Sequence, residues 1–148
     1  MARNKNRYLM LGASLTVVAA LVHLGCIVFG GDWYRFLGAG EQMAVLAEQG
    51  HWYPTAVTLV IVFVLSLWAI YGYSGANVIV RLPLLRTALC LISAIYLIRG
   101  IAFVVIVPFF PGNTLLFWIV SSGICFGIGC LYALGTYQQW NSLGSKDG

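Results

Sequence analysis

One arginine interrupts an apolar run in the stretch SAIYLIRGIAFVV, residues 93–105. A guanidinium is always charged, and its planar N–H groups match the geometry of carboxylates and phosphates. In the middle of a membrane helix such a charge costs about 2.5–3.5 kcal/mol on insertion scales. Arg99 therefore needs a partner, and it is the first candidate for a binding or structural site.

Three kinds of partner are open to Arg99. The side chain could extend to lipid phosphates at the membrane surface. An acid of the first long loop, Asp32, Glu41 or Glu48, could form a charge-assisted pair with it. A bound anionic molecule could also satisfy the guanidinium, which would make Arg99 a ligand-binding residue.

Two other polar side chains are predicted to lie near Arg99. Tyr96 precedes it by three residues, so one helix carries both on the same side. His23 and Arg99 each lie roughly 22 Å along an outward-running helix from its inner end, at 1.5 Å per residue. We predict a polar cluster of Arg99, His23 and Tyr96 with the loop acids Glu41 and Glu48. The alternative role of His23 is hydrogen-bonded packing.

Four apolar stretches must position these side chains. The chain has 148 residues, of which 61% are hydrophobic and 8% charged, and its mean hydropathy is +0.91. This composition cannot cover a water-facing surface. We predict an all-α membrane protein, a single domain over residues 1–148, with four transmembrane helices in a bundle. The predicted spans are residues 8–30, 54–75, 84–107 and 114–137.

Basic residues set the predicted orientation. Most of them precede the first span, flank the second loop or lie in the tail: Arg3, Lys5, Arg7, Arg81, Arg86 and Lys146. By the positive-inside rule both termini are cytoplasmic. The basic start also resembles a signal peptide, but the apolar run continues through Phe29, so we predict that it is retained as a span. The net charge of +4 is then a topology signal, and no nucleic-acid partner is predicted.

The loop of residues 31–53 contains a predicted short amphipathic helix over residues 39–49. Glu41 and Glu48 lie seven residues apart and share one face of it. Such a helix could lie at the membrane surface or fold over the bundle as a lid.

The sequence lacks the residues that several kinds of functional site require. The two histidines, His23 and His51, are unsuited to paired haem ligation, and no zinc-site spacing occurs. No predicted span contains an acid, which disfavours a proton-coupled carrier. We predict no metal site, no catalytic residue and no cofactor other than a bound lipid. An acid–base pair of His23 and Glu41 is the least supported alternative.

The last span contains SSGICFGIGC, in which Gly123 and Gly127 lie four residues apart. Small residues on one helix face permit close helix packing. This face could pack within the bundle or against a second chain.

At YRFLGAGEQM (34–43), RLPLLR (81–86) and YLIRG (96–100) the chain resembles a group of small bacterial inner-membrane proteins without an assigned activity. The resemblance covers most of residues 20–105. It implies a bacterial envelope protein with four spans, and it transfers no cofactor or catalytic residue. The small multidrug-resistance transporters share only the size and span number, since their first-span glutamate has no counterpart here.

These observations predict a non-enzymatic protein of the bacterial inner membrane that binds a lipid or a small amphipathic anion in the outer half of the bundle. The first alternative is an accessory subunit of a larger membrane complex, and the second is a small transporter that acts as an oligomer. Expected partners are membrane lipids and a second copy or another membrane protein.

Overall fold

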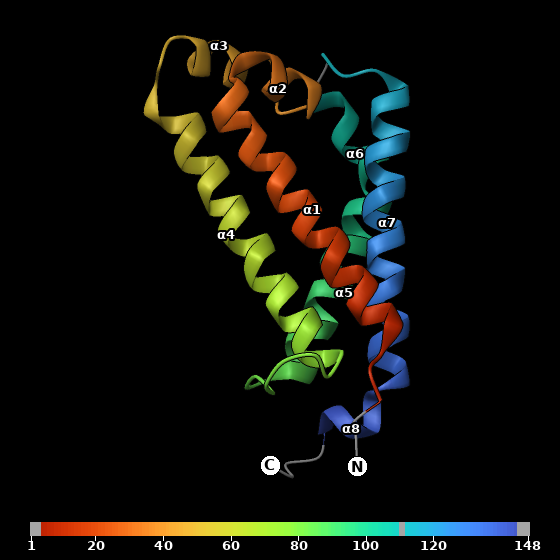
Figure 1. Cartoon of the computed structure of the whole chain (residues 1–148). Coiled ribbons are helices and arrows are strands. Elements are labelled where there is room, and N and C mark those ends of the chain that lie inside the picture. Colours follow the sequence, from red (N-terminus) through yellow and green to blue (C-terminus); the bar gives the residue numbers. More distant parts are fainter. Residues whose placement is uncertain (1–3, 110–111, 145–148) are drawn as a thin grey trace.

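The computed structural model describes residues 4–109 and 112–144, and its regular structure in these ranges is entirely helical (Figure 1). Helices α1, α4 and α7 are each long and apolar enough to cross a membrane. The elements in chain order are α1 (Arg7–Phe29), α2 (Gly31–Phe36), α3 (Glu41–Glu48), α4 (Trp52–Gly75), α5 (Leu85–Ile101), α6 (Phe103–Ile106), the 3-10 turn η1 (Val107–Phe109), α7 (Leu115–Gln138) and α8 (Trp140–Gly144).

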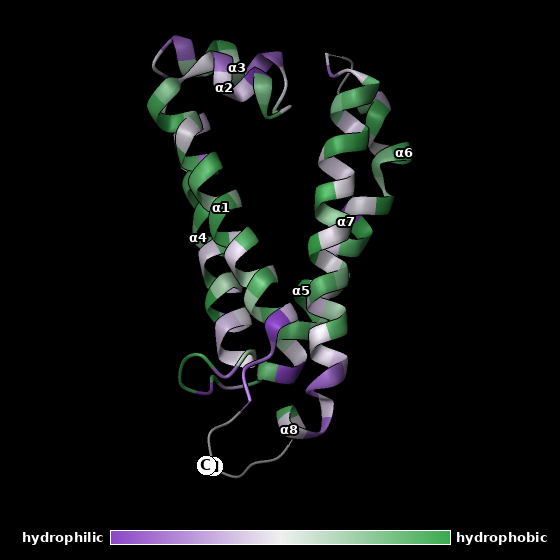
Figure 2. Cartoon of the chain, turned by 45° about the vertical axis from the view of Figure 1, so that its right-hand side comes forward, coloured by the Kyte–Doolittle hydropathy of each residue, from purple (hydrophilic) through white to green (hydrophobic). Residues whose placement is uncertain are grey.

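The long helices form two antiparallel hairpins. Helix α1 packs along α4, and α5 packs along α7. Helices α2 and α3 connect α1 to α4 at the end that we call the outer end, whereas the inner end carries both termini (Figure 1). The hairpins meet at the inner end and diverge toward the outer end (Figure 2). Residues 76–84 connect the hairpins at the inner end.

Local capping explains where two of the long helices begin. The Asn6 side chain accepts a hydrogen bond from the backbone N–H of Leu9, and Thr114 does the same for Phe117. Each cap satisfies one of the free N–H groups of a first helical turn. The Asn6 side chain also donates to the Gln138 side chain at 2.9 Å, so it connects the start of α1 to the end of α7.

Glycines permit the close approach of the long helices. A Cβ atom at Gly12 would lie 3.2 Å from the ring of Tyr132, and one at Gly72 would lie 2.8 Å from the hydroxyl of the same residue. Between α5 and α7, a Cβ atom at Gly100 or at Gly129 would approach the backbone of the facing helix to 2.8 or 2.9 Å. The distances at Gly72, Gly100 and Gly129 are too short for a Cβ atom, whereas one at Gly12 would require the ring of Tyr132 to shift.

The predicted span over residues 84–107 is not one continuous helix. Helix α5 ends at Ile101 after 17 residues, about 26 Å at the helical rise, and is followed by α6 and η1. Pro108 lacks an N–H, and its ring excludes the carbonyl of Val104, four positions earlier, so it acts on α6 and η1 rather than at Ile101. Adjacent β-branched residues such as Val104 and Val105 add little helix propensity. The described residues thus provide three candidate spans, and the fourth stays a prediction.

The outer loop holds two helices where one was predicted. Helix α3 lies within the predicted residues 39–49, whereas the six residues of α2 are too few to give a recognisable periodicity. Tyr34 of α2 and Ala44 of α3 are buried against Cys26, near the outer end of α1. Helices α2 and α3 therefore form a packed outer cap.

The surfaces of the long helices are largely apolar, and many large apolar side chains on them are exposed (Figure 2). This surface and the three long apolar helices are compatible with a membrane location.

Candidate functional site

Arg99 lies near the outer end of α5 and reaches α7. Its Nη1 donates to Oγ of Ser122 and its Nη2 to Oγ of Ser121, each at 3.4 Å. These distances exceed the usual 2.7–3.2 Å, and both acceptors are neutral. The guanidinium carbon also lies 5.6 Å from the ring centroid of Trp118, within the range of a cation–π interaction. In the described part of the chain no carboxylate pairs with Arg99.

The two serines next to Arg99 retain hydroxyl hydrogens that can be donated. Other hydroxyls in the long helices, such as those of Thr16 and Thr58, donate to the carbonyl four residues earlier. Neither Ser121 nor Ser122 makes that bond among the described residues, and each accepts from the guanidinium instead. Ser122 is only 3% exposed. One cation and two hydroxyl donors therefore converge, which is the donor set of an anion site.

The hydroxyl of Tyr96 does not join this site. It lies 3.1 Å from Oγ1 of Thr16, which donates its own hydrogen to a carbonyl of α1, so Tyr96 is the donor to Thr16. The Tyr132 hydroxyl lies 3.3 Å from the same Oγ1 and donates to the carbonyl of Trp68 at 3.2 Å. These groups come from α1, α4, α5 and α7 and form what we call the hydroxyl layer. Tyr96 thus has a structural role one turn below Arg99.

His23 lies on the face of α1 that also carries Thr16, two turns farther toward the outer end. Its Nδ1 lies 2.7 Å from the carbonyl oxygen of Ala19. Because a carbonyl only accepts, Nδ1 carries the hydrogen, and Nε2 of the neutral ring is an acceptor. No hydrogen bond connects His23 to Arg99 within residues 4–109.

The three acids of the outer loop are bound to Arg35 of α2 rather than to Arg99. Arg35 donates to both carboxylate oxygens of Glu41, at 2.9 and 2.7 Å. Its Nη1 also contacts Glu48 and, at 3.3 Å, Asp32. Hydrogen bonds from Arg35, and then its charge, hold the pKa values of Glu41 and Glu48 below the usual range. The same bonds raise the pKa of Arg35. The structure therefore places Glu41 and Glu48 with Arg35 and not beside Arg99.

The outer cap reaches across to the second hairpin. The side chain of Asn113 donates to the carbonyl of Gly38 at 3.1 Å. Gly38 has φ of +71°, and a Cβ atom there would collide with the ring of Phe117, so only glycine suits this position. Tyr34 of the cap lies 2.9 Å from the Thr58 hydroxyl of α4. The cap thus connects both hairpins beyond the level of Arg99.

The sequence did not predict the neighbours of Arg99 or the partner of the loop acids. Ser121 and Ser122 lie seven and eight residues from Thr114, and Arg99 lies eight residues from Val107. Matching depths in neighbouring antiparallel helices was the signal that could have paired them. The six-residue separation of Arg35 and Glu41 across a glycine-rich turn gives no comparable signal.

Gly123 and Gly127 of α7 pack against nothing in the described residues. A Cβ atom at either position would meet no atom within 4 Å. The predicted alternative of packing within the bundle is therefore not seen there, and the close contacts of α7 fall instead on Gly129 and Gly135.

The described residues contain no group of three or more His, Cys, Asp or Glu side chains arranged to hold a metal ion. The fold and the Arg99 site define the chain as an all-helical protein with three helices fit to cross a membrane and a cation among its apolar helices. Comparisons with protein-family models, with curated proteins and with solved structures find no match.

Proposed function

We propose that the chain is an integral protein of the bacterial inner membrane that binds the anionic headgroup of an amphiphile at Arg99. The observation that carries the proposal is a guanidinium between apolar helices whose hydrogen bonds are long and go to neutral hydroxyls. A charge within the membrane normally has a pairing partner. The described acids are bound to Arg35, so the missing negative charge comes from a ligand.

The chemistry around Arg99 specifies the ligand class. A phosphate or carboxylate accepts hydrogen bonds from the guanidinium and from the hydroxyls of Ser121 and Ser122. On the neighbouring helix surfaces Ile98, 64% exposed, and Ile119, 55% exposed, face outward. Such apolar surroundings favour a ligand that enters from the bilayer, namely a phospholipid or a fatty acid.

The orientation that we propose places the inner end in the cytoplasm. The described basic residues at that end are Lys5, Arg7, Arg81 and Arg86, whereas the described acids lie in the outer cap. This distribution agrees with the positive-inside rule. In spheroplasts, a membrane-impermeant thiol reagent is expected to label Gln49→Cys and not Ser142→Cys. Labelling of Ser142→Cys alone would show that the chain has the opposite orientation.

The binding proposal is tested by native mass spectrometry of protein released from phosphatidylcholine nanodiscs that contain phosphatidylglycerol or oleate. Wild type is expected to retain one of these anions at Arg99, and Arg99→Gln to retain it about 10- to 100-fold less, the effect of losing a charge-assisted contact of about 1.5–3 kcal/mol. Arg35→Gln removes the same charge from the outer cap and is the matched control. Equal retention in the two variants would refute the site.

A second candidate function is docking of another membrane helix on α7, supported by the open surface at Gly123 and Gly127. Glycine lowers helix stability by about 1 kcal/mol relative to alanine unless close packing offsets it. If α7 docks a second chain, Gly127→Leu is expected to convert dimers in nanodiscs to monomers, as counted by single-molecule photobleaching. Gly112→Leu is the control, because a Cβ atom at Gly112 would also meet no described atom within 4 Å. An unchanged monomer count would exclude this interface.

A further inference from the structure

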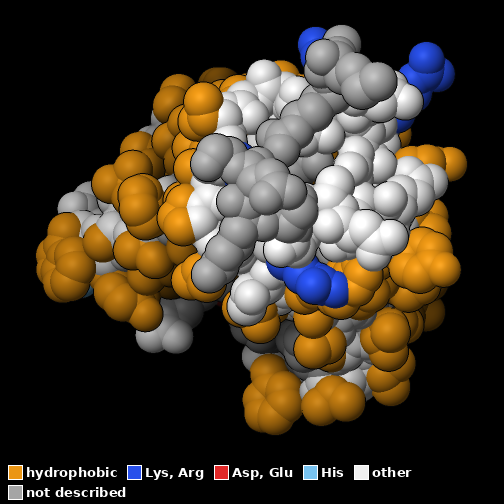
Figure 3. Space-filling model, turned by 90° about the horizontal axis from the view of Figure 1, so that it is seen from below, with side chains coloured by type: hydrophobic (Ala, Val, Ile, Leu, Met, Phe, Trp, Pro, Cys, Tyr) orange, Lys and Arg blue, Asp and Glu red, His pale blue; other side chains and the backbone are white. Residues whose placement is uncertain are grey.

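The inner end carries positive charge that no described acid neutralises. The described basic residues there are Lys5, Arg7, Arg81 and Arg86. Figure 3 shows this end with Lys and Arg side chains and without any Asp or Glu among the described residues in view. In the orientation proposed above, cations at this end face the phosphates of the inner leaflet.

Two of these cations are held in place by the short helix α8. Arg81 donates through Nη1 to the carbonyl of Ser142 at 2.8 Å and through Nη2 to the carbonyl of Leu143. The guanidinium carbon of Arg86 lies 3.3 Å from the ring centroid of Trp140. Since α8 has five residues and is about 7.5 Å long, both guanidiniums contact one small element.

The existing contacts leave both guanidiniums incompletely satisfied. Backbone carbonyls and an aromatic ring provide partial negative charge but no ion pair, so each residue keeps its full positive charge. Nε of Arg86 is buried and has no hydrogen-bond partner among the described residues. Arg81 uses two of its five N–H donors on the carbonyls. An anion would complete the coordination of this pair.

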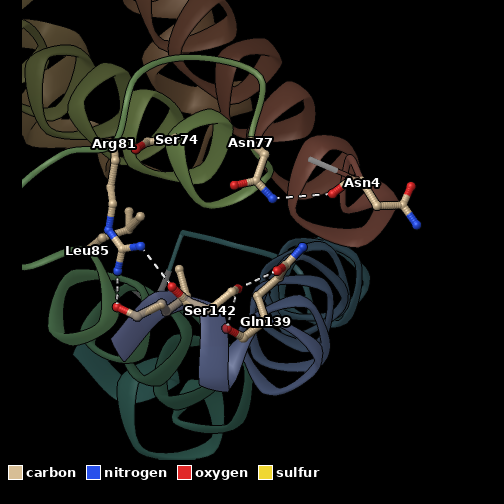
Figure 4. A pocket seen from close by; sticks show the side chains of 8 residues that line it. Asn4, Ser74, Asn77, Arg81, Leu85, Gln139 and Ser142 are labelled. Carbon is tan, nitrogen blue, oxygen red and sulfur yellow. Dashed lines mark hydrogen bonds between the residues drawn. The ribbon is translucent and has the colours of Figure 1, made fainter. Parts of the chain in front are cut away.

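A pocket lies next to Arg81 between the two hairpins (Figure 4). Its volume is about 210 Å³, roughly that of seven waters at 30 Å³ each. Polar side chains on its wall include Asn77, Gln139 and Ser142, and Leu85 supplies an apolar part. The pocket therefore offers hydrogen-bond donors and acceptors for a polar headgroup beside a positive charge.

The surface around this site is suited to acyl chains. Val80, Leu84 and Tyr137 are 79%, 78% and 81% exposed near the same end of the helices. Trp140 belongs to the aromatic residue types that favour the headgroup layer. A soluble anion would make no use of these apolar contacts, whereas a phospholipid makes both kinds.

We infer that Arg81 and Arg86, with the adjoining pocket, form a second binding site that takes the headgroup of an anionic phospholipid from the inner leaflet. The headgroup phosphate accepts hydrogen bonds from the two guanidiniums, and the acyl chains lie against the exposed apolar residues of the inner end. The site is separate from the one proposed at Arg99, so either can fail alone.

The test counts phosphatidylglycerol retained by the full chain after release from phosphatidylcholine nanodiscs doped with that lipid. Removing a charge-assisted contact weakens binding by about tenfold or more. Arg86→Gln is therefore expected to lose one retained lipid that Arg99→Gln keeps. The bonds from Arg81 to α8 are intact in Arg86→Gln, which limits any effect on folding. The doubly substituted Lys5→Gln and Arg7→Gln chain removes two inner charges that have no hydrogen bond or ring contact with α8 among the described residues, and it is expected to retain the lipid.

Three outcomes would overturn the inference. Wild-type retention in Arg86→Gln and in an Arg81→Gln, Arg86→Gln chain would show that these residues bind no lipid. Equal loss in the Lys5→Gln, Arg7→Gln control would show a diffuse charge effect rather than a site. Displacement of phosphatidylglycerol by inorganic phosphate at equal concentration would assign the site to a soluble anion.

Discussion

Replacing Thr16 by valine tests the hydroxyl layer that joins the four long helices. Thr16 is fully buried and accepts a hydrogen bond from Tyr96, which is 6% exposed. Valine keeps the shape of threonine but cannot accept, so the Tyr96 hydroxyl is left buried without its acceptor. An unsatisfied buried group costs about 1–3 kcal/mol, and we expect Thr16→Val to lower the free energy of unfolding by that amount.

Two other substitutions set the scale for this value. Tyr132→Phe removes a hydrogen bond to a carbonyl within α4, where the helix supplies another donor, so its cost is about 0.6 kcal/mol, the mean for such bonds in a membrane protein. Adding Tyr96→Phe to Thr16→Val removes the stranded hydroxyl. Because loss of both partners is nearly neutral, the double variant is expected to be more stable than Thr16→Val alone.

The assay is equilibrium unfolding in mixed micelles, followed by far-ultraviolet circular dichroism. Each 1.4 kcal/mol corresponds to a tenfold change in the unfolding equilibrium. Thr16→Ser, which loses a methyl group but keeps the hydroxyl that accepts from Tyr96, is the control. The reasoning fails if Thr16→Val unfolds at the wild-type denaturant concentration, or if the double variant is no more stable than the single one.

Two further predictions concern the outer cap and the helix contacts. Arg35 lowers the folded-state pKa values of Glu41 and Glu48. The ion pairs therefore stabilise the folded outer cap fully at pH values above the usual glutamate pKa, and this stabilisation is lost as the pH falls through the lowered pKa values. Hydrogen exchange in α3 should accelerate over that acidic range in wild type and show no such transition in Arg35→Gln. Gly100→Ala places a Cβ atom 2.8 Å from the α7 backbone and should lower the free energy of unfolding by about 1–3 kcal/mol. Gly123→Ala, where the Cβ atom meets no described atom within 4 Å, should leave the stability unchanged. Similar unfolding midpoints for the two variants would contradict this prediction.

Apolar patterning predicted most of the helical content but not how its polar residues pair. The runs that became α1, α4 and α7 are long and uniformly apolar, so their existence follows from composition. The break after Ile101 leaves no signal in a hydropathy window, which averages over local helix propensity.

The sequence identified Arg99 as the centre of the candidate site, but it did not predict which residues lie next to it. Depth along one helix places a side chain in the membrane, yet the rotation of the facing helix decides what it meets. Ser121 and Ser122 became its neighbours through that rotation. Arg35 competes for the acids because it lies in the same loop and pairs with them over a short stretch of chain.

Because the two hairpins diverge toward the outer end, they are arranged to rotate relative to each other about their contact near the inner end. The hydroxyl layer joins the two hairpins, whereas at the outer end each hairpin is closed by its own loop. From Thr16 to Phe29 the lever arm is about 20 Å, so each degree of rotation moves the tip by about 0.3 Å. The hydrogen bond from Asn113 to Gly38 joins the outer ends of the two hairpins, so breaking it is expected to let these ends move apart while the hydroxyl layer stays intact.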